Sequence, residues 1–473
     1  TVVQVLALLQ GMAMEQGKTF RIRLAAPTGK AAARLTESIS RAMELVPERL
    51  QAHMPTEVTT LHRLLGTRHH TRQFVHNQNN QLHVDLLVVD EASMVDLEMM
   101  AALLSALPFH ARLILLGDKD QLASVEAGSV LGDICTNASN PCYRPETVDL
   151  IKKATGYAIS AFSGPGKNMD QRIVMLRKSH RFHENSGIGE LSRAVNQGDE
   201  KQVSRIWEKG YADIARLVIH SCEDAGFRSL VLDGNPKAFP PAAEQPAGYR
   251  EYLEIMARGF GAWASEDHWF RAVLESFNRF QLLSPIRKGD WGVEELNHIT
   301  ARILYNARLI RATRGWYPGR PVMVTRNDYS LGLMNGDIGI VLEVGADRQK
   351  DNEGKNLSEK VLRVVFPMAD GSLKQVLPSR LGSVETVYAM TVHKSQGSEF
   401  DHTALVMPDT MNPVLTRELI YTGITRARTF FTLAGRSTDL LAAAVKQRTH
   451  RASGLGDLLF QGVDITTGAL DFL

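Results

Sequence analysis

Two adjacent carboxylates, Asp90 and Glu91, directly follow the apolar run Leu86-Leu87-Val88-Val89. Four consecutive apolar residues are typical of a strand buried on both faces of a parallel sheet, and α/β proteins bind ligands outside the carboxyl ends of such strands. There the first carboxylate can bind Mg²⁺, and the second can hold the water that attacks a phosphoryl group. The alternative is a strand followed by a solvated acidic turn, and this stretch alone leaves both open.

A second apolar run, Leu113-Ile114-Leu115-Leu116, ends in Gly117-Asp118-Lys119-Asp120-Gln121. The pattern between the two runs predicts a helix over residues 97–107, and a strand–helix–strand unit of this kind brings both strand ends to one edge of a sheet. At that edge Gln121 could hydrogen-bond a γ-phosphate or a water molecule. Otherwise it is a turn residue.

A third predicted strand, residues 21–26, runs into Pro27-Thr28-Gly29-Lys30 and a helix over residues 31–43. A strand, a tight turn and a helix N-terminus together offer backbone N–H groups, a hydroxyl and a lysine to a phosphate. That phosphate could belong to a nucleotide or to a nucleic-acid backbone. The turn could also be a plain connector.

The sequence contains no phosphate-binding loop of the GxxxxGK[ST] type. Gly17-Lys18-Thr19 has Met12 where the first glycine belongs and follows a predicted helix over residues 1–16, so we interpret it as a helix-ending turn. Gly164-Pro165-Gly166-Lys167 also fails, because Ala161 stands in the place of the first glycine.

The composition is that of an ordinary globular chain, with 44% hydrophobic and 22% charged residues. A length of 473 residues predicts roughly two to four domains. The formal net charge of +2 neither requires nor excludes a nucleic-acid partner, so any basic footprint must be local. No apolar stretch is long enough for a membrane span, and the start does not resemble a signal peptide, so we expect a cytoplasmic protein without a membrane partner. Three cysteines, Cys135, Cys142 and Cys222, are too few for a disulfide framework or a zinc site.

The rest of the chain divides by pattern. Residues 135–170 are a predicted irregular boundary between domains, residues 187–280 are mainly helical, and residues 319–383 alternate like the short strands of a small inserted β-barrel. The polar segment 53–83 is rich in histidine, but its spacing matches no metal-ligand motif, so we interpret it as a solvated or DNA-facing insertion. Its histidines are His53, His62, His69, His70, His76 and His83.

Two later stretches combine several chemically active side chains. Thr391-Val392-His393-Lys394-Ser395-Gln396-Gly397 is predicted to be a strand end and a helix start, and residues 418–428 are predicted to be a helix with Arg426 near its end. A predicted strand over residues 173–176 leads into a basic cluster that contains Arg181. Such arginines can neutralise charge on a transferring phosphoryl group, or they can form ordinary surface salt bridges.

In this order, these segments resemble the motifs of superfamily 1 DNA helicases across nearly the whole chain. The matching segments are residues 26–30 (motif Ia), 60–66 (the motif after it), 90–93 (motif II), 117–122 (motif III), Arg181 (motif IV), 391–397 (motif V) and 421–427 (motif VI). The sequences of residues 390–401 and 332–339 are similar to those of the 5′→3′ helicase subunit of a bacterial helicase–nuclease.

The resemblance implies a fold and a division of the chain. The expected fold class is α/β, with two RecA-like parallel-sheet domains of the P-loop NTPase type and a small inserted β-barrel similar to a Src-homology-3 domain. The first RecA-like domain would be residues 1–170, the second residues 171–310 and 384–473, and the barrel residues 311–383. Motif I, the phosphate loop, is not in this sequence, nor is the N-terminal domain that precedes it in the family. We therefore expect that these 473 residues alone do not hydrolyse ATP.

The resemblance also implies roles for individual residues. The expected catalytic residues are Glu91, Gln121, Arg181 and Arg426. The expected nucleotide-binding residues are Asp90, which is also the magnesium ligand, Gly117, Asp118, Gln396 and Gly397. The expected DNA-binding residues are Pro27, Thr28, Gly29, Thr60, His62, Thr391, His393 and Lys394.

The function implied by the resemblance is ATP-dependent 5′→3′ movement along single-stranded DNA, with ATP and Mg²⁺ as cofactors, in DNA recombination and repair. The implied partners are single-stranded DNA, the duplex being unwound, and the other two subunits of a helicase–nuclease complex. Two alternatives stay open, a non-hydrolysing DNA-binding or scaffold subunit and a helicase of the same type that works alone. No second carboxylate cluster accompanies Asp90 and Glu91 to hold two metal ions, so we do not expect nuclease activity in this chain.

Overall fold

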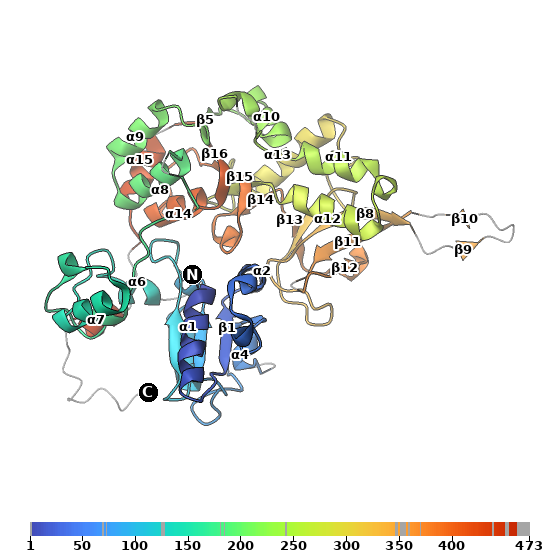
Figure 1. Ribbon diagram of the computed structural model, residues 1–473. Helices are drawn as coiled ribbons and strands as arrows, with labels where there is room; N and C mark the ends of the chain where they lie inside the picture. The colour runs from blue at the N-terminus through green and yellow to red at the C-terminus, as the bar shows by residue number, and fades with distance from the viewer. Residues whose placement is uncertain are drawn as a thin grey trace. The chain divides into compact units, whose positions relative to one another are not determined.

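A computed structural model describes residues 2–460 except 69–70, 72, 124–127, 180, 184, 242–243, 346–348, 351–355, 358–359, 369, 438 and 450–453. The chain forms two compact units (Figure 1). The first unit is built from the described residues before 181 together with helix α16 (Leu455–Phe460), and the second from the described residues between 181 and 449. None of the described helices is both long and apolar enough to cross a membrane. The domain boundaries given above stay predictions.

The first unit contains a four-stranded sheet, ordered β2-β1-β3-β4, in which every pairing is parallel. Its strands are β1 (Ile22–Ala26), β2 (Val58–Thr60), β3 (Leu86–Val89) and β4 (Arg112–Leu115). All four residues of β3 are buried, as the apolar run predicts. Because β3 pairs with both β1 and β4 in parallel, the carboxyl ends of three strands meet at one edge, which confirms the predicted arrangement.

Helices cover both faces of this sheet (Figure 1). Leu6 of α1 and Leu35 of α2 pack on one face, and Leu65 of α4 and Leu103 of α5 pack on the other. The helices of the unit are α1 (Val2–Glu15), α2 (Gly29–Ala42), α3 (Glu48–Gln51), α4 (Leu61–Leu65), α5 (Leu97–Ala106), α6 (Val130–Ile134), α7 (Pro145–Thr155) and α16.

The first helix ends as a glycine-terminated turn. Gly17 has a φ of 68°, and its N–H donates to the carbonyl of Met14. A left-handed glycine directly after a helix is a common way to end it. This confirms the interpretation of Gly17-Lys18-Thr19 as a turn and not as a phosphate loop.

The second unit contains a five-stranded sheet, ordered β14-β6-β15-β16-β5, and its pairings are also all parallel. The strands are β5 (Ile214–Val218), β6 (Phe280–Ser284), β14 (Ala389–Thr391), β15 (Phe400–Val406) and β16 (Ala427–Gly435). The helices are α8 (Gly187–Gln197), α9 (Glu200–Glu208), α10 (Ala225–Asp233), α11 (Arg250–Arg258), α12 (Glu266–Phe277), α13 (Val293–Asn306), α14 (Arg417–Ile424) and α15 (Asp439–Lys446). Two parallel sheets with helices confirm the predicted α/β class.

An antiparallel sheet is inserted between β6 and β14, in the order β12-β11-β8-β7-β13. Its strands are β7 (Pro321–Val324), β8 (Ile338–Gly345), β11 (Lys360–Pro367), β12 (Leu373–Val376) and β13 (Val384–Thr386), with β9 (Gln349–Lys350) and β10 (Asn356–Leu357) forming a separate small ladder. Buried Tyr252 fastens the insert to the helices of the unit by donating its hydroxyl to the carbonyl of Gly319 at 2.8 Å. No ladder among the described residues joins β12 to β13, so closure into a barrel stays a prediction.

Four local predictions are wrong. Residues 135–170, predicted to be irregular, contain the 11-residue helix α7. Residues 173–176 form no strand, because no described strand pairs with them, and Val174 and Leu176 are exposed. The helix predicted over 418–428 ends at Ile424, because β16 begins at Ala427. The helix predicted after Thr391 is only a 3₁₀ turn, His393–Ser395.

Candidate functional site

The turns that follow β3 and β4 are joined by the backbone. The N–H of Ala92 donates to the carbonyl of Leu116 at 2.8 Å, and the N–H of Asp90 donates to the carbonyl of Ala25 at the end of β1 at 2.9 Å. Gly117 lets the two turns come this close, since a Cβ on it would lie 3.1 Å from the backbone nitrogen of Ala92. The acidic pair and the Gln121 loop are therefore parts of one edge.

The carboxylate of Asp90 is in a desolvated position. Burial raises its pKa, while a hydrogen bond from the backbone N–H of Glu91 and the charge of Arg34 on α2 lower it. A carboxylate that burial makes costly to ionise is stabilised by a nearby cation, and carboxylate oxygen is a preferred ligand of Mg²⁺. The residues at this edge fit a magnesium ion, and the role of Asp90 as its ligand stays a prediction.

Glu91 has an unusual backbone conformation. Its φ of 51° and ψ of 38° place it in the left-handed region, which residues other than glycine rarely adopt. The strain is maintained by the hydrogen bond from the next residue, Ala92, to the carbonyl of Leu116, directly after β4. Non-glycine residues held in such conformations often occur at functional sites, because the strain fixes the direction of a side chain.

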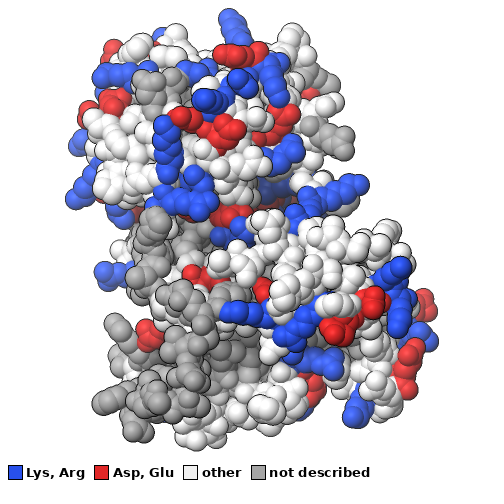
Figure 2. All heavy atoms as spheres, turned by 90° about the vertical axis from the view of Figure 1, so that its left-hand side faces the viewer, with Lys and Arg blue, Asp and Glu red and all other residues white. Residues whose placement is uncertain are grey.

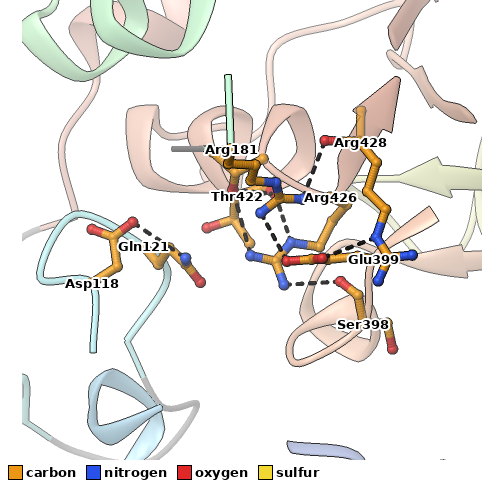
Figure 3. Close-up of polar contacts among 10 residues, drawn as sticks. Asp118, Gln121, Arg181, Ser398, Glu399, Thr422, Arg426 and Arg428 are labelled. Atoms are coloured by element: carbon orange, nitrogen blue, oxygen red, sulfur yellow. Dashed lines mark hydrogen bonds and ion pairs between the residues drawn. The ribbon is translucent and has the colours of Figure 1, made fainter. Parts of the chain in front are cut away.

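The loop after β4 is organised by Asp118. Its carboxylate accepts the N–H of Asp120 at 3.0 Å and the side-chain amide of Gln121 at 3.2 Å (Figure 3). Lys119 forms an ion pair with Asp120 at 2.6 Å. In this structure Asp118 therefore positions Gln121, and a direct contact of Asp118 with nucleotide stays a prediction.

Two of the residues predicted to bind DNA act as helix caps. The hydroxyl of Thr28 accepts the N–H of Ala31 at 3.2 Å, and the hydroxyl of Thr60 accepts the N–H of Arg63 at 3.3 Å. A capping hydroxyl keeps its own proton, so it can still donate to a phosphate. Pro27 and Gly29 flank Thr28 in the same half-buried turn.

The histidine-rich segment forms no metal site in the described part of the chain, where no three His, Cys, Asp or Glu side chains come together. His69 and His70 lie outside the described residues. His62 is exposed and stacks edge-to-face on Phe74, with ring centroids 6.0 Å apart. Its predicted contact with DNA is sterically open but stays a prediction.

In the second unit, one carboxylate holds two arginines. Glu399 forms ion pairs with Arg181 at 2.9 Å and with Arg428 at 3.1 Å, and its side chain is 9% exposed (Figure 3). Arg181 also donates to the carbonyl of Ala427 at 3.2 Å. Its side chain is 30% exposed, so it can reach solvent or a ligand from this position.

Arg426, unlike Arg181, is buried, with 2% of its surface exposed. Its guanidinium donates to the carbonyls of Thr422 and Ser398, both at 3.1 Å (Figure 3). These bonds connect the end of α14 to the segment before β15. In this arrangement Arg426 stabilises the fold, and its predicted catalytic role stays a prediction.

The stretch that resembles motif V lies at the carboxyl end of β14. Thr391 is level with Ser284 at the end of the neighbouring strand β6, and its hydroxyl accepts the N–H of Lys394 at 3.3 Å. Thr391, His393 and Lys394 are each partly exposed there. Gln396 and Gly397, the predicted nucleotide-binding pair, are both buried.

A second bridging carboxylate joins this stretch to the inserted sheet. Glu385 on β13 forms ion pairs with Lys394 and, at 3.1 Å, with Arg287, which follows β6. Two cations are thereby gathered at the end of β6 and β14, where the sequence predicts DNA. The face drawn in Figure 2 shows Lys and Arg side chains interspersed with Asp and Glu, in keeping with the small net charge.

The sequence prediction did not include Glu399, Glu385 or Arg287. Their ion-pair partners lie between 9 and 218 residues away in the sequence, so no local pattern reveals them. The only signal for Glu399 was its place directly after the motif V stretch.

Family models match both ends of the chain. A model described as an AAA domain matches residues 1–127, and one described as a UvrD-like helicase C-terminal domain matches residues 386–433. The "RecBCD enzyme subunit RecD" of Haemophilus influenzae is 36% identical over 93% of this chain and 65% of its own length. The protein of the same name from Mycobacterium tuberculosis is 36% identical over 96% of this chain and 67% of its own length. The chain thus spans about two thirds of these relatives.

Among solved structures, the chain is similar to Bacteroides Pif1 bound to single-stranded DNA. The two are 17% identical, the match covers 92% of this chain and 86% of the other, and the TM-score is 0.41.

Proposed function

This chain belongs to the RecD family of RecBCD enzyme subunits, and from that premise we propose that it is the ATP-driven motor of a DNA helicase–nuclease. It moves 5′→3′ along single-stranded DNA in the cytoplasm, during recombination and repair, together with the other two subunits of the complex. The observation that carries the proposal is the hydrogen-bonded junction of the β3 and β4 turns, which holds Asp90, Glu91 and Gln121 at one edge.

Asp90 holds Mg²⁺ in the proposed mechanism. The ion, when bound with ATP, neutralises charge on the phosphates. Glu91 orients the attacking water and accepts its proton, and its fixed backbone keeps the carboxylate in one direction. Gln121, held by Asp118, detects whether the γ-phosphate is present.

Arg181 is the arginine that neutralises the transferring phosphoryl group in this proposal. Arginine suits the role because its planar guanidinium binds phosphate oxygens in pairs. Glu399 and the carbonyl of Ala427, at the start of β16, hold Arg181 until nucleotide competes for it. Hydrolysis then changes which contacts Arg181 makes, and this change couples ATP turnover to movement.

Single-stranded DNA binds the proposed motor mainly through its phosphates, as a translocating protein requires. Thr28 at the end of β1, and Thr391 with Lys394 at the end of β14, supply a hydroxyl or a charge. Binding should therefore depend little on base sequence and weaken steeply with salt.

The test is DNA-stimulated ATP hydrolysis by the complete gene product carrying Asp90→Asn. Loss of a magnesium ligand removes several kcal/mol of charge stabilisation, so turnover should fall roughly 10²-fold or more. The matched control is Asp96→Asn, whose carboxylate caps α5 at 2.7 Å from the N–H of Met99. Asparagine caps helices as well as aspartate does, so this control should keep its activity. Equal activity in both variants would contradict the proposal, and inactivity of the wild type would favour a scaffold subunit.

A further inference from the structure

A hollow of about 270 Å³ opens on the inserted sheet, between the loop after β7 and the segment before β13. Apolar, polar and aromatic side chains line it. The lining residues used below are Val324, Leu333, Leu381, Arg326, Asn327 and Tyr329. A hollow with an apolar part and a few polar groups is suited to a flat organic ring.

The loop that carries Tyr329 is held rigidly by its own hydrogen bonds. Asn335 N–H donates to the side-chain oxygen of Asn327 at 2.8 Å. The carboxylate of Asp328 accepts the hydroxyl of Ser330 at 2.7 Å and the N–H of Leu331 at 3.0 Å. Tyr329 is nevertheless 62% exposed. A large aromatic ring on a fixed loop can stack against another ring without first losing much conformational entropy.

Three cations surround this loop. Arg326 is exposed at the rim of the hollow. The ammonium group of Lys374 on β12 lies 3.6 Å from the position that a Cβ on Gly332 would occupy. Hydrogen bonds from Ser330 and Leu331 lower the pKa of Asp328, and the charge of nearby Arg380 lowers it further. These three cations outnumber the two carboxylates of the loop, Asp328 and Asp337, so the local charge is positive, which favours a phosphate-bearing ligand.

The hollow lies beside the edge that is proposed to bind DNA, and between them is β13, the edge strand of the inserted sheet, whose successive side chains point to opposite faces. Ser383 and Val384 line it, and the next residue on β13 is Glu385, the partner of Lys394 and Arg287. Neighbouring residues along a strand are about 3.3 Å apart. A strand of nucleic acid that passes Lys394 therefore has the hollow within reach.

We propose that this hollow, here called the Tyr329 pocket, binds one unpaired base of single-stranded DNA. The base stacks on the Tyr329 ring above Leu333 and Leu381, and its phosphate lies by Arg326. The inference rests on the proposed function, because it assumes that DNA follows the motif V edge. Every base can stack on an aromatic ring, so the pocket adds affinity without adding sequence preference.

The experiment measures binding of the complete gene product to a fluorescent oligothymidylate and to an abasic oligonucleotide of equal length. Tyr329→Ala should weaken oligothymidylate binding about fivefold or more, as loss of a stacked base does, and leave abasic binding within about twofold. Tyr329→Phe keeps the ring and should keep the affinity. Tyr305→Ala is the matched control, since Tyr305 is 49% exposed on α13, away from the pocket.

Wild-type affinity of Tyr329→Ala, alongside weakened binding by Lys394→Ala, would overturn the pocket and leave the proposed function standing. Equal weakening toward both oligonucleotides, or equal losses in Tyr329→Phe and Tyr329→Ala, would also overturn it, since the effect would then come from the loop and not from stacking. If the wild type bound neither oligonucleotide, both the pocket and the proposed function would be wrong.

Discussion

Glu91 combines a reactive position with a strained backbone. Residues in the left-handed region typically cost about 1–3 kcal/mol unless they are glycine. Here the hydrogen bond from Ala92 to Leu116 holds the turn, and Gly117 makes room for it. The sequence revealed the carboxylate but not the strain, because the strain depends on a hydrogen bond to Leu116, which is 25 residues after Glu91 in the sequence.

Glu91→Gln should abolish most ATP turnover while leaving the fold intact. The amide is nearly isosteric but cannot accept a proton, and general-base catalysis is typically worth about 10²–10⁴-fold. ATP hydrolysis with saturating single-stranded DNA measures the effect, and binding of ATP and of DNA serves as the control. A variant with more than half the wild-type rate would remove Glu91 from the mechanism.

Arg181 and Arg426 should respond differently to replacement by lysine. Lysine keeps the charge but loses the planar fork. In Arg181→Lys, turnover should fall sharply at an unchanged melting temperature, because that side chain is 30% exposed and held by ion pairing. In Arg426→Lys, buried carbonyls lose their donors, so the free energy of unfolding should fall by about 2 kcal/mol.

Thermal unfolding and ATP hydrolysis, measured on both variants, distinguish these roles. Arg426→Lys with a wild-type melting temperature and low turnover would instead assign the catalytic role to Arg426. Its guanidinium would then have to leave Thr422 and Ser398 when nucleotide binds.

At the scale of elements, strands buried on both faces were the most predictable. β3 has the bounds that its apolar run predicts, and β1 and β4 differ from prediction by one residue at their ends. β5 was missed because Arg216, which is exposed in this edge strand, interrupts the apolar run. Residues 173–176 have the composition of a strand, but composition supplies no partner for the backbone.

The functional side chains were also predictable only where a local sequence pattern determines their position. Side chains at the ends of predictable strands, such as Asp90 and Gln121, were found from the sequence. Those whose role depends on a distant partner, such as Glu399, were not. Likewise, Arg426 resembled a catalytic arginine in sequence, and only the structure shows the carbonyls that bind it.

Strand β15 carries a fully buried histidine. His402 contacts the carbonyl of Ala247 at 2.8 Å and the hydroxyl of Thr432 at 2.9 Å, and burial lowers its pKa to about 4, against an opposing contribution from the Ala247 hydrogen bond. An unfolded chain binds the proton near pH 6.5, so between those values the unfolded state holds more protons. The contribution of neutral His402 to the free energy of unfolding is therefore fully present above about pH 6.5, and it is lost as the pH falls toward 4.

Wild-type protein should therefore lose more stability than His402→Gln between pH 7 and pH 5. The excess loss should approach about 1.4 kcal/mol per pH unit below pH 6. Melting temperatures of the two proteins at matched pH values measure it. Parallel declines would mean that His402 is not the titrating group.

At the scale of the whole molecule, two parallel α/β units each present reactive side chains at the carboxyl ends of their strands. The first presents acids and a glutamine there, and the second presents Thr391 and Lys394 at the end of β14. The ion pair of Arg181 with Glu399 lies instead at the amino ends of β15 and β16. A small net charge of +2 agrees with local binding of DNA at these edges and not with a broadly basic surface. The proposed movement along DNA would require both units.

Displacement of streptavidin from biotinylated single-stranded DNA tests ATP-driven movement most directly. The complete gene product, supplied with ATP and Mg²⁺, should release streptavidin from the 3′ end much faster than from the 5′ end, and Glu91→Gln should release it from neither. Faster release from the 5′ end would mean that the protein moves 3′→5′. Failure to release streptavidin from either end, in protein that binds the DNA, would contradict the motor and identify a DNA-binding scaffold.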